Sequence, residues 1–142
     1  MRPVYEIINY QLVNVVYYRL SNGFPETMKL FLKASDFNED QQVYTIYPVL
    51  EIKFKESEPS IFQFQSSYRI NQIEWMNSIN KNQLDAILFA SIFPFIRSTV
   101  HHITDDYRGA INLPIMDLRM VNFQTGITFN ITNKNEFKRM NN

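Results

Sequence analysis

The chain has 142 residues, which is the size of one domain, so we expect a single domain spanning 1–142. Lys plus Arg and Asp plus Glu number 14 each, so no net field favours nucleic acid or an anionic membrane as a partner. The lack of Cys excludes disulfides and thiolate chemistry and is typical of a reducing compartment, so we expect a cytoplasmic location. No signal core is visible, and the longest apolar run, Ala86 to Ile96, is too short to span a bilayer.

The first predicted strand covers 8–20, which is rich in β-branched and aromatic residues, and turn residues follow at 21–23. Its alternation is imperfect, because apolar residues point to both faces. This pattern predicts that a partner covers the second face.

A second strand is predicted in the sequence TMKLFLKAS at 27–35. Met28, Leu30, Leu32 and Ala34 share one face of this strand, so it should be half-buried.

Two further strands are predicted at 43–55 and 61–70, each with an apolar face and a polar face. Pro48 cannot donate a hydrogen bond, so the earlier of these strands should lie at a sheet edge or contain a bulge. Short connections between the four strands predict an antiparallel meander.

A long helix is predicted next, capped by Ser78 or Asn82 and running to Tyr107, where Arg108-Gly109 stops it. Pro94 should kink it. One apolar stripe should cover the sheet: Phe89, Phe93, Ile96, Val100, Ile103 and Tyr107. A second apolar group on the other side predicts an oligomer interface: Leu84, Ile87, Leu88 and Phe95. The alternative is that a loop or the C-terminal segment covers this group within one chain.

The candidates for chemistry are His101, His102, Asp105 and Asp106, since a spacing of four pairs each His with one Asp on a helix. These residues occupy the polar face, and no third ligand is evident. We therefore interpret them as solvated charge and predict no metal, no cofactor and no catalytic residue. Phosphate loops, nucleophile elbows and the HExxH zinc motif are also missing from the sequence, so the chain is not expected to be an enzyme.

The stretch from FPFIR at 93–97, through Arg108-Gly109, to Val121-Asn122-Phe123 resembles the sequence hallmark of the SecB family of export chaperones. The order of the upstream strands is similar too, so the resemblance covers nearly the whole chain. It implies an α+β fold in which a four-stranded antiparallel sheet is packed by one long helix, with a short C-terminal segment.

The resemblance also implies function. SecB-like proteins are homotetramers, built as dimers of dimers, that hold unfolded polypeptides in apolar grooves without ATP. On this chain the groove would draw on Met28, Leu30, Leu32, Phe123 and Ile127, although plain core positions are an equally good interpretation of all five.

Two departures from the family pattern bear on the partner. The chain is neutral where the family is acidic, and the matching stretch Ser60 to Ile73 contains no Asp or Glu. Docking to a translocase motor ATPase is therefore open, and a dedicated chaperone for an antitoxin is the second context. The alternative function is a non-catalytic structural or adaptor subunit with one fixed protein partner.

Overall fold

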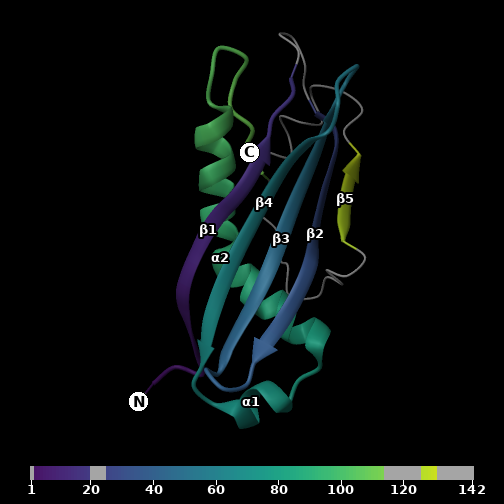
Figure 1. Cartoon of the computed structure of the whole chain (residues 1–142). Coiled ribbons are helices and arrows are strands. Elements are labelled where there is room, and N and C mark those ends of the chain that lie inside the picture. Colours follow the sequence, from purple (N-terminus) through teal and green to yellow (C-terminus); the bar gives the residue numbers. More distant parts are fainter. Residues whose placement is uncertain (1, 20–24, 114–125, 131–142) are drawn as a thin grey trace.

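The computed structural model describes residues 2–19, 25–113 and 126–130. They form one antiparallel sheet and two helices (Figure 1). The elements are β1 (Tyr5–Val16), β2 (Pro25–Asn38), β3 (Val43–Phe54), β4 (Ser60–Ile70), α1 (Ile73–Asn77), α2 (Lys81–Thr104) and β5 (Ile127–Asn130). The predicted α+β class, with a long helix on an antiparallel sheet, is confirmed. β5 adds a fifth strand to the four that were expected.

The order of strands in the sheet is β1-β4-β3-β2-β5. β2, β3 and β4 form a meander, but β1 pairs with β4 and not with β2. The predicted four-strand meander is therefore wrong, and the four strands have the Greek-key order. β1 becomes an edge strand at one side of the sheet, and β5 lies at the other side (Figure 1).

Two bulges in β1 explain its imperfect alternation. The pairing with β4 skips one β1 residue at Ile8 and another at Val13. Each extra residue reverses which positions face the helix. Tyr5 lies opposite buried Ile70, whereas Leu12, of opposite parity, lies opposite buried Phe64. The apolar residues on both faces thus follow from the bulges, and the alternation alone does not require a covering partner.

Pro48 lies in β3, the middle strand of the sheet, so its predicted place at an edge is wrong. The predicted bulge does occur beside it, but in the neighbouring strand. The pairing of β2 passes from Leu32, opposite Pro48, to Ser35, opposite Ile46, so β2 has one extra residue. Ala34 is consequently exposed, and Ser35 takes the face that points to the helix.

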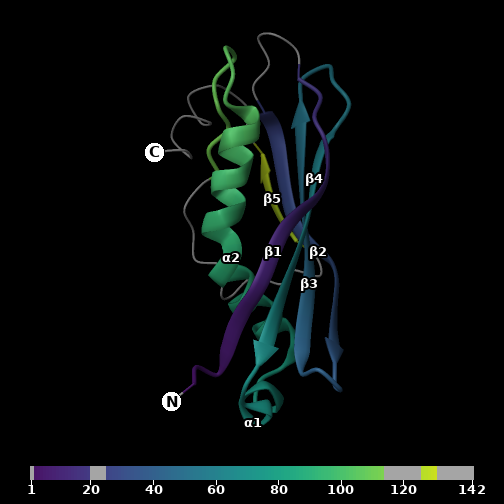
Figure 2. The same ribbon diagram turned by 60° about the vertical axis from the view of Figure 1, so that its left-hand side comes forward.

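α2 lies across one face of the sheet (Figure 2). Asn80, not Ser78 or Asn82, caps it. The Asn80 side chain accepts from the Gln83 N–H at 2.8 Å, and the Gln83 side chain accepts from the Asn80 N–H at 3.2 Å. This is a capping box, which satisfies two otherwise unpaired donors. The helix ends at Thr104, before the predicted Tyr107, and α1 was not expected from the sequence.

α2 continues without interruption through Pro94, and its ribbon changes direction about midway along the helix (Figure 1). By length and hydropathy alone, α2 is able to cross a membrane. Of the apolar window, 39% is buried, and these buried side chains belong to the core that α2 forms with the sheet.

The described residues share one hydrophobic core between the sheet and α2. Tyr68 ties the two layers together, because its hydroxyl donates to the Leu88 carbonyl at 2.7 Å and accepts from the Ser66 hydroxyl at 2.9 Å. The largest fully buried side chains are Tyr68, Phe54, Phe62, Phe64, Phe89, Met28, Ile46, Leu50, Ile52, Ile70 and Leu88. The predicted helix stripe is buried as far as Val100. Beyond it, Ile103 is 36% exposed and Tyr107 84% exposed.

Candidate functional site

Apolar side chains are exposed along the edge strand β1. Exposed fractions range from 36% at Val15 to 55% at Val13. We call this group the β1 surface: Ile7, Ile8, Val13, Val15 and Val16. They flank the edge from both faces of the sheet, since Val15 lies opposite buried Phe62 and Val16 opposite Ile61. A polypeptide that paired with this edge would contact apolar side chains on either face.

The β1 surface continues onto α2 through one aromatic pair. The rings of Tyr10, in β1, and Phe95, in α2, are 5.0 Å apart at their centroids. Phe95 itself is 44% exposed. An incoming apolar segment would therefore meet side chains from both the sheet and the helix.

The four predicted interface residues separate into two groups. Leu84 and Leu88 are 4% and 0% exposed and belong to the core, so their expected place on the outer side of the helix is corrected. Sequence periodicity misassigned them because the helix is apolar nearly all round in its first half. Ile87 is partly exposed and Phe95 is exposed, so both are available to a partner.

The predicted peptide-binding residues are not an open groove wall in this structure. Met28, Leu30 and Leu32 are 0%, 2% and 8% exposed and lie in the core. This agrees with the alternative interpretation of these residues as core positions. A client would reach them only if the covering elements moved. The backbone of Ile127 pairs with Leu30 across β5 and β2, and Phe123 lies outside the described residues.

A buried polar cluster joins α2 to the sheet. Asp85, on α2, is 2% exposed. Its carboxylate accepts from the Tyr44 hydroxyl at 2.7 Å and from the Ser35 hydroxyl at 3.2 Å. The bulge in β2 makes the second bond possible, because it turns Ser35 toward the helix. We call Ser35, Tyr44 and Asp85 the buried triad.

Desolvation dominates the electrostatics of the buried triad. Burial raises the pKa of the Asp85 carboxyl, although the hydroxyls of Tyr44 and Ser35 and the charge of Lys81 act in the opposite direction. Burial also raises the pKa of Tyr44 far above its ordinary value. Sequence analysis missed this cluster. The signal was a charged residue, Asp85, between two apolar residues on the helix.

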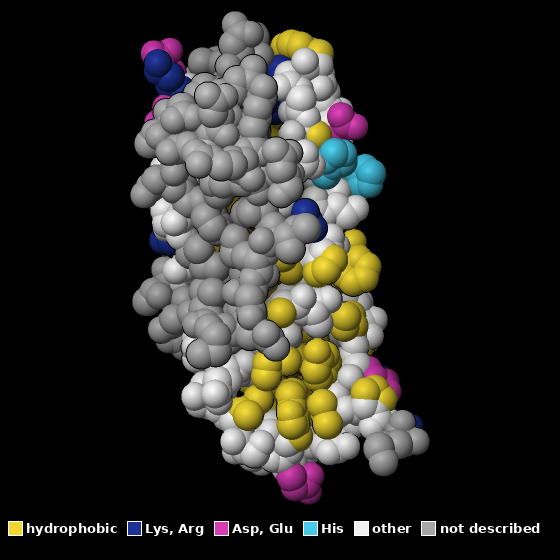
Figure 3. Space-filling model, turned by 180° about the vertical axis from the view of Figure 1, so that it is seen from behind, with side chains coloured by type: hydrophobic (Ala, Val, Ile, Leu, Met, Phe, Trp, Pro, Cys, Tyr) yellow, Lys and Arg dark blue, Asp and Glu magenta, His cyan; other side chains and the backbone are white. Residues whose placement is uncertain are grey.

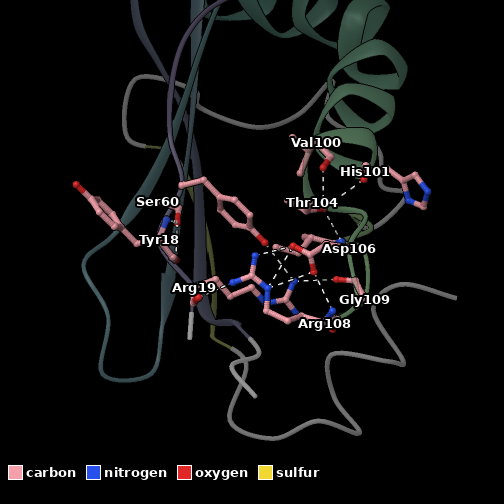
Figure 4. A network of polar contacts seen from close by, with 11 residues as sticks. Tyr18, Arg19, Ser60, Val100, His101, Thr104, Asp106, Arg108 and Gly109 are labelled. Atoms are coloured by element: carbon pink, nitrogen blue, oxygen red, sulfur yellow. Dashed lines mark hydrogen bonds and ion pairs between the residues drawn. The ribbon is translucent and has the colours of Figure 1, made fainter. Parts of the chain in front are cut away.

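Polar contacts fix the chain where α2 ends, beside the end of β1 (Figure 4). Arg19 donates to the carbonyls of Gly109, at 2.8 Å, and Arg108, at 3.0 Å. Arg108 in turn forms an ion pair with Asp106 and donates to the Arg19 carbonyl. The hydrogen bonds from Arg108 lower the pKa of Asp106 to about 2. These bonds serve the structure of this corner.

Two of the four His and Asp residues considered as candidates for chemistry, His101 and Asp106, have structural partners. His101 Nδ1 lies 2.5 Å from the side-chain oxygen of Asn112, and Asp106 is held by Arg108. Within the part of the chain that the structure describes, no three His, Cys, Asp or Glu residues are grouped as metal ligands would be.

Comparison with known proteins places the fold. No family model and no curated protein matches the sequence. A structure of the Mycobacterium tuberculosis Rv1957 SecB-like chaperone, in complex with a ChAD peptide from the Rv1956 HigA1 antitoxin, matches this chain with a TM-score of 0.57. The match has 11% sequence identity and covers 79% of this chain and 90% of that chain. This chain has the SecB-like fold.

A second solved structure, of a protein of unknown function from Streptococcus agalactiae, matches with a TM-score of 0.41 and 16% identity. The match covers 78% of this chain and 97% of that chain. The fold itself follows from the match to the Rv1957 structure. The neutral charge of this chain differs from the acidic pattern expected of the family.

Proposed function

We propose that this SecB-like chain is an ATP-independent, non-catalytic chaperone of the cytoplasm that holds unfolded polypeptide. The observation that carries the proposal is the fold shared with a SecB-like chaperone whose structure contains an antitoxin peptide. The exposed apolar side chains of the β1 surface supply a physical means of holding such a segment. Burial of apolar area drives binding without requiring one sequence, so many unfolded segments would be accepted.

The partner that the charge favours is an antitoxin-type client. A translocase motor that docks on acidic residues would find none in β4, because Ser60–Ile70 contains neither Asp nor Glu. The Rv1957 structure holds a peptide of an antitoxin, which is a client of the kind proposed here. Export remains the alternative use of the same holding activity.

An aggregation assay tests this function. Several unrelated proteins are diluted from denaturant with and without the chain, in the absence of ATP, and light scattering is followed. We expect suppression of scattering for more than one of them. Suppression of a single protein would favour the adaptor function with one fixed partner, and suppression of none would overturn the holding function.

Self-association is part of the same proposal, as a homotetramer in which Val13 of β1 and the α2 side chains Ile87 and Phe95 face another copy, while the rest of the β1 surface holds the client. In the described residues β1 pairs on one side only, with β4, so its outer side is open to a second chain. Val13 is the most exposed apolar side chain of this strand, at 55%. Burying an apolar side chain of this size contributes about 1.5–3 kcal/mol.

A charge at this edge should therefore weaken the assembly. We expect Val13→Glu to lower the mass measured in solution by light scattering at micromolar concentration. Thr128→Glu is the matched control, since it puts the same carboxylate at an exposed position of β5, at the opposite edge of the sheet. A wild-type chain that is monomeric, or equal masses for both variants, would contradict the interface.

A further inference from the structure

Two hollows adjoin between β2 and the start of α2. The larger, of about 340 Å³, opens beside α1, and the smaller, of about 240 Å³, opens beside the bulge in β2. Ser35 and Lys81 line both hollows, so a ligand can extend from one into the other. We call the pair the β2–α2 trough. Among the described residues, none from β1 lines it, so the trough is separate from the β1 surface.

The larger hollow is mostly apolar. Its lining includes Phe37 from β2, Met76 from α1 and Leu84 from α2. Figure 3 shows hydrophobic side chains gathered at the end of the molecule that carries α1. The volume of this hollow lies at the lower end of the range of small-ligand sites. It therefore suits a small apolar body better than a large cofactor.

The bulge in β2 shapes the smaller hollow. The pairing with β3 passes from Leu32 to Ser35, so β2 has one extra residue there. In a regular strand the residue after buried Leu32 would point away from α2. At the bulge, Lys33 instead lines a hollow that Lys81 and Asp85 of α2 also line. The interruption of the strand thus brings a lysine of the sheet and a lysine of the helix to the same hollow.

The charges of the smaller hollow favour an anion. Lys33 and Lys81 supply two positive charges against the single carboxyl of Asp85, so positive charge is in excess. The Asp85 carboxylate is already engaged, because it accepts from the hydroxyls of Tyr44 and Ser35. Neither lysine has an ion-pair partner among the described residues. Both ammonium groups would attract an anionic group and repel a cationic one.

Asp36 sets the direction in which such a ligand lies. This residue lines the larger hollow and does not line the smaller one. An anionic group in the larger hollow would meet a like charge there, whereas in the smaller hollow it meets two lysines. A ligand with one anionic head and one apolar body therefore has its head in the smaller hollow and its body in the larger.

We propose that the β2–α2 trough binds a fatty acid of medium chain length, with the carboxylate between Lys33 and Lys81 and the acyl chain in the apolar hollow. The carboxylate balances the excess of positive charge, and burial of the acyl chain drives binding. This site goes beyond the proposed holding of polypeptide and does not depend on it, because no residue of the β1 surface takes part.

Titration of the isotope-labelled full chain with octanoate, followed by NMR, tests the proposal. Acetate has the head without the chain, octanol has the chain without the charge, and octylamine reverses the charge. We expect octanoate to bind on the order of fivefold more tightly than octanol, as contacts with two solvent-accessible cations would give. Acetate and octylamine should bind more weakly than either. Amide shifts should change at Lys33, Phe37 and Met76.

Lysine variants locate the head of the ligand. Lys33→Gln and Lys81→Gln should each weaken octanoate binding about two- to threefold and leave octanol binding unchanged, since each keeps a polar side chain and removes its charge. Lys29→Gln is the matched control, because Lys29 is exposed on the same strand and lines neither hollow. It should leave octanoate binding as it was.

The terminus of a polypeptide also joins a carboxylate to an apolar group, and N-acetyl-leucine represents it. Its amide would lose hydrogen bonds to water on entering the apolar hollow, so we expect it to bind more weakly than octanoate. Tighter binding of N-acetyl-leucine would assign the trough to chain termini and overturn the fatty-acid proposal.

Equal affinity for octanoate and octanol would also overturn the proposal, as would an octanoate affinity that neither Lys33→Gln nor Lys81→Gln lowers. Shifts confined to the β1 surface would contradict it too, because they would show unspecific association with exposed apolar residues. The aggregation assay measures the holding of polypeptide separately, so failure of the trough and failure of the proposed function are distinguishable.

Discussion

Phe89→Ala is expected to lower the free energy of unfolding by about 3–5 kcal/mol, as removal of a fully buried ring does. Phe89 is 0% exposed on α2, and its ring lies 5.9 Å from that of Phe93. Small domains are stabilised by about 5–15 kcal/mol, so the loss is a large part of the total. Urea unfolding at fixed protein concentration should show a lower midpoint with little change in slope.

Phe95→Ala is the matched control, because it makes the same change on the same helix at a side chain that is 44% exposed. Its cost should be about 1 kcal/mol or less. If both variants lost equal stability, the orientation of α2 on the sheet would be contradicted. A large effect of Phe95→Ala that grows with protein concentration would instead show that Phe95 is buried between copies.

Asp85→Ala and Asp85→Asn are expected to change stability in opposite directions at neutral pH. Alanine removes the acceptor of the buried Tyr44 hydroxyl, which costs about 1–3 kcal/mol, and that of the part-buried Ser35 hydroxyl, which costs less. Asparagine keeps an acceptor for Tyr44 and removes a buried charge, so it should stabilise the fold. Urea unfolding of the two variants beside wild type measures both effects.

The pH dependence of Asp85→Asn has a definite sign. Burial raises the pKa of Asp85 above its ordinary 3.8, so the native chain keeps a proton that the unfolded chain has released. The wild-type contribution is therefore most favourable below about pH 4 and is lost as the pH rises through the native pKa. The advantage of Asp85→Asn should grow from about pH 4 to about pH 7. A constant difference across this range would contradict burial of an ionising Asp85.

The predicted strands and the long helix were recognisable because hydrophobic alternation and helical periodicity are local. The pairing of β1 with β4 was not, since Tyr5 and Ile70 are far apart in the sequence and nothing near either one specifies the partner. The bulges at Ile8, Val13 and 33–34 were missed for a related reason. A residue is extra only in comparison with the strand it pairs with, so a bulge cannot be recognised before the pairing is known.

Much of the candidate site was beyond sequence reasoning. Periodicity placed Phe95 on the surface correctly, but it also placed Leu84 and Leu88 there, because an all-round apolar helix does not show which side meets the sheet. Asp85 was the one available signal of the buried triad. Its partners come from two strands, and one of them, Ser35, faces the helix only because β2 bulges.

The interruptions in β1 have a consequence for colloidal behaviour. The bulges at Ile8 and Val13 divide β1 into three stretches that pair regularly with β4. These stretches are 5–7, 9–12 and 14–16. Cross-β fibrils grow from regular segments of about six residues or more. The apolar edge of this sheet is thus a poor template for fibril growth, although it exposes valine and isoleucine side chains.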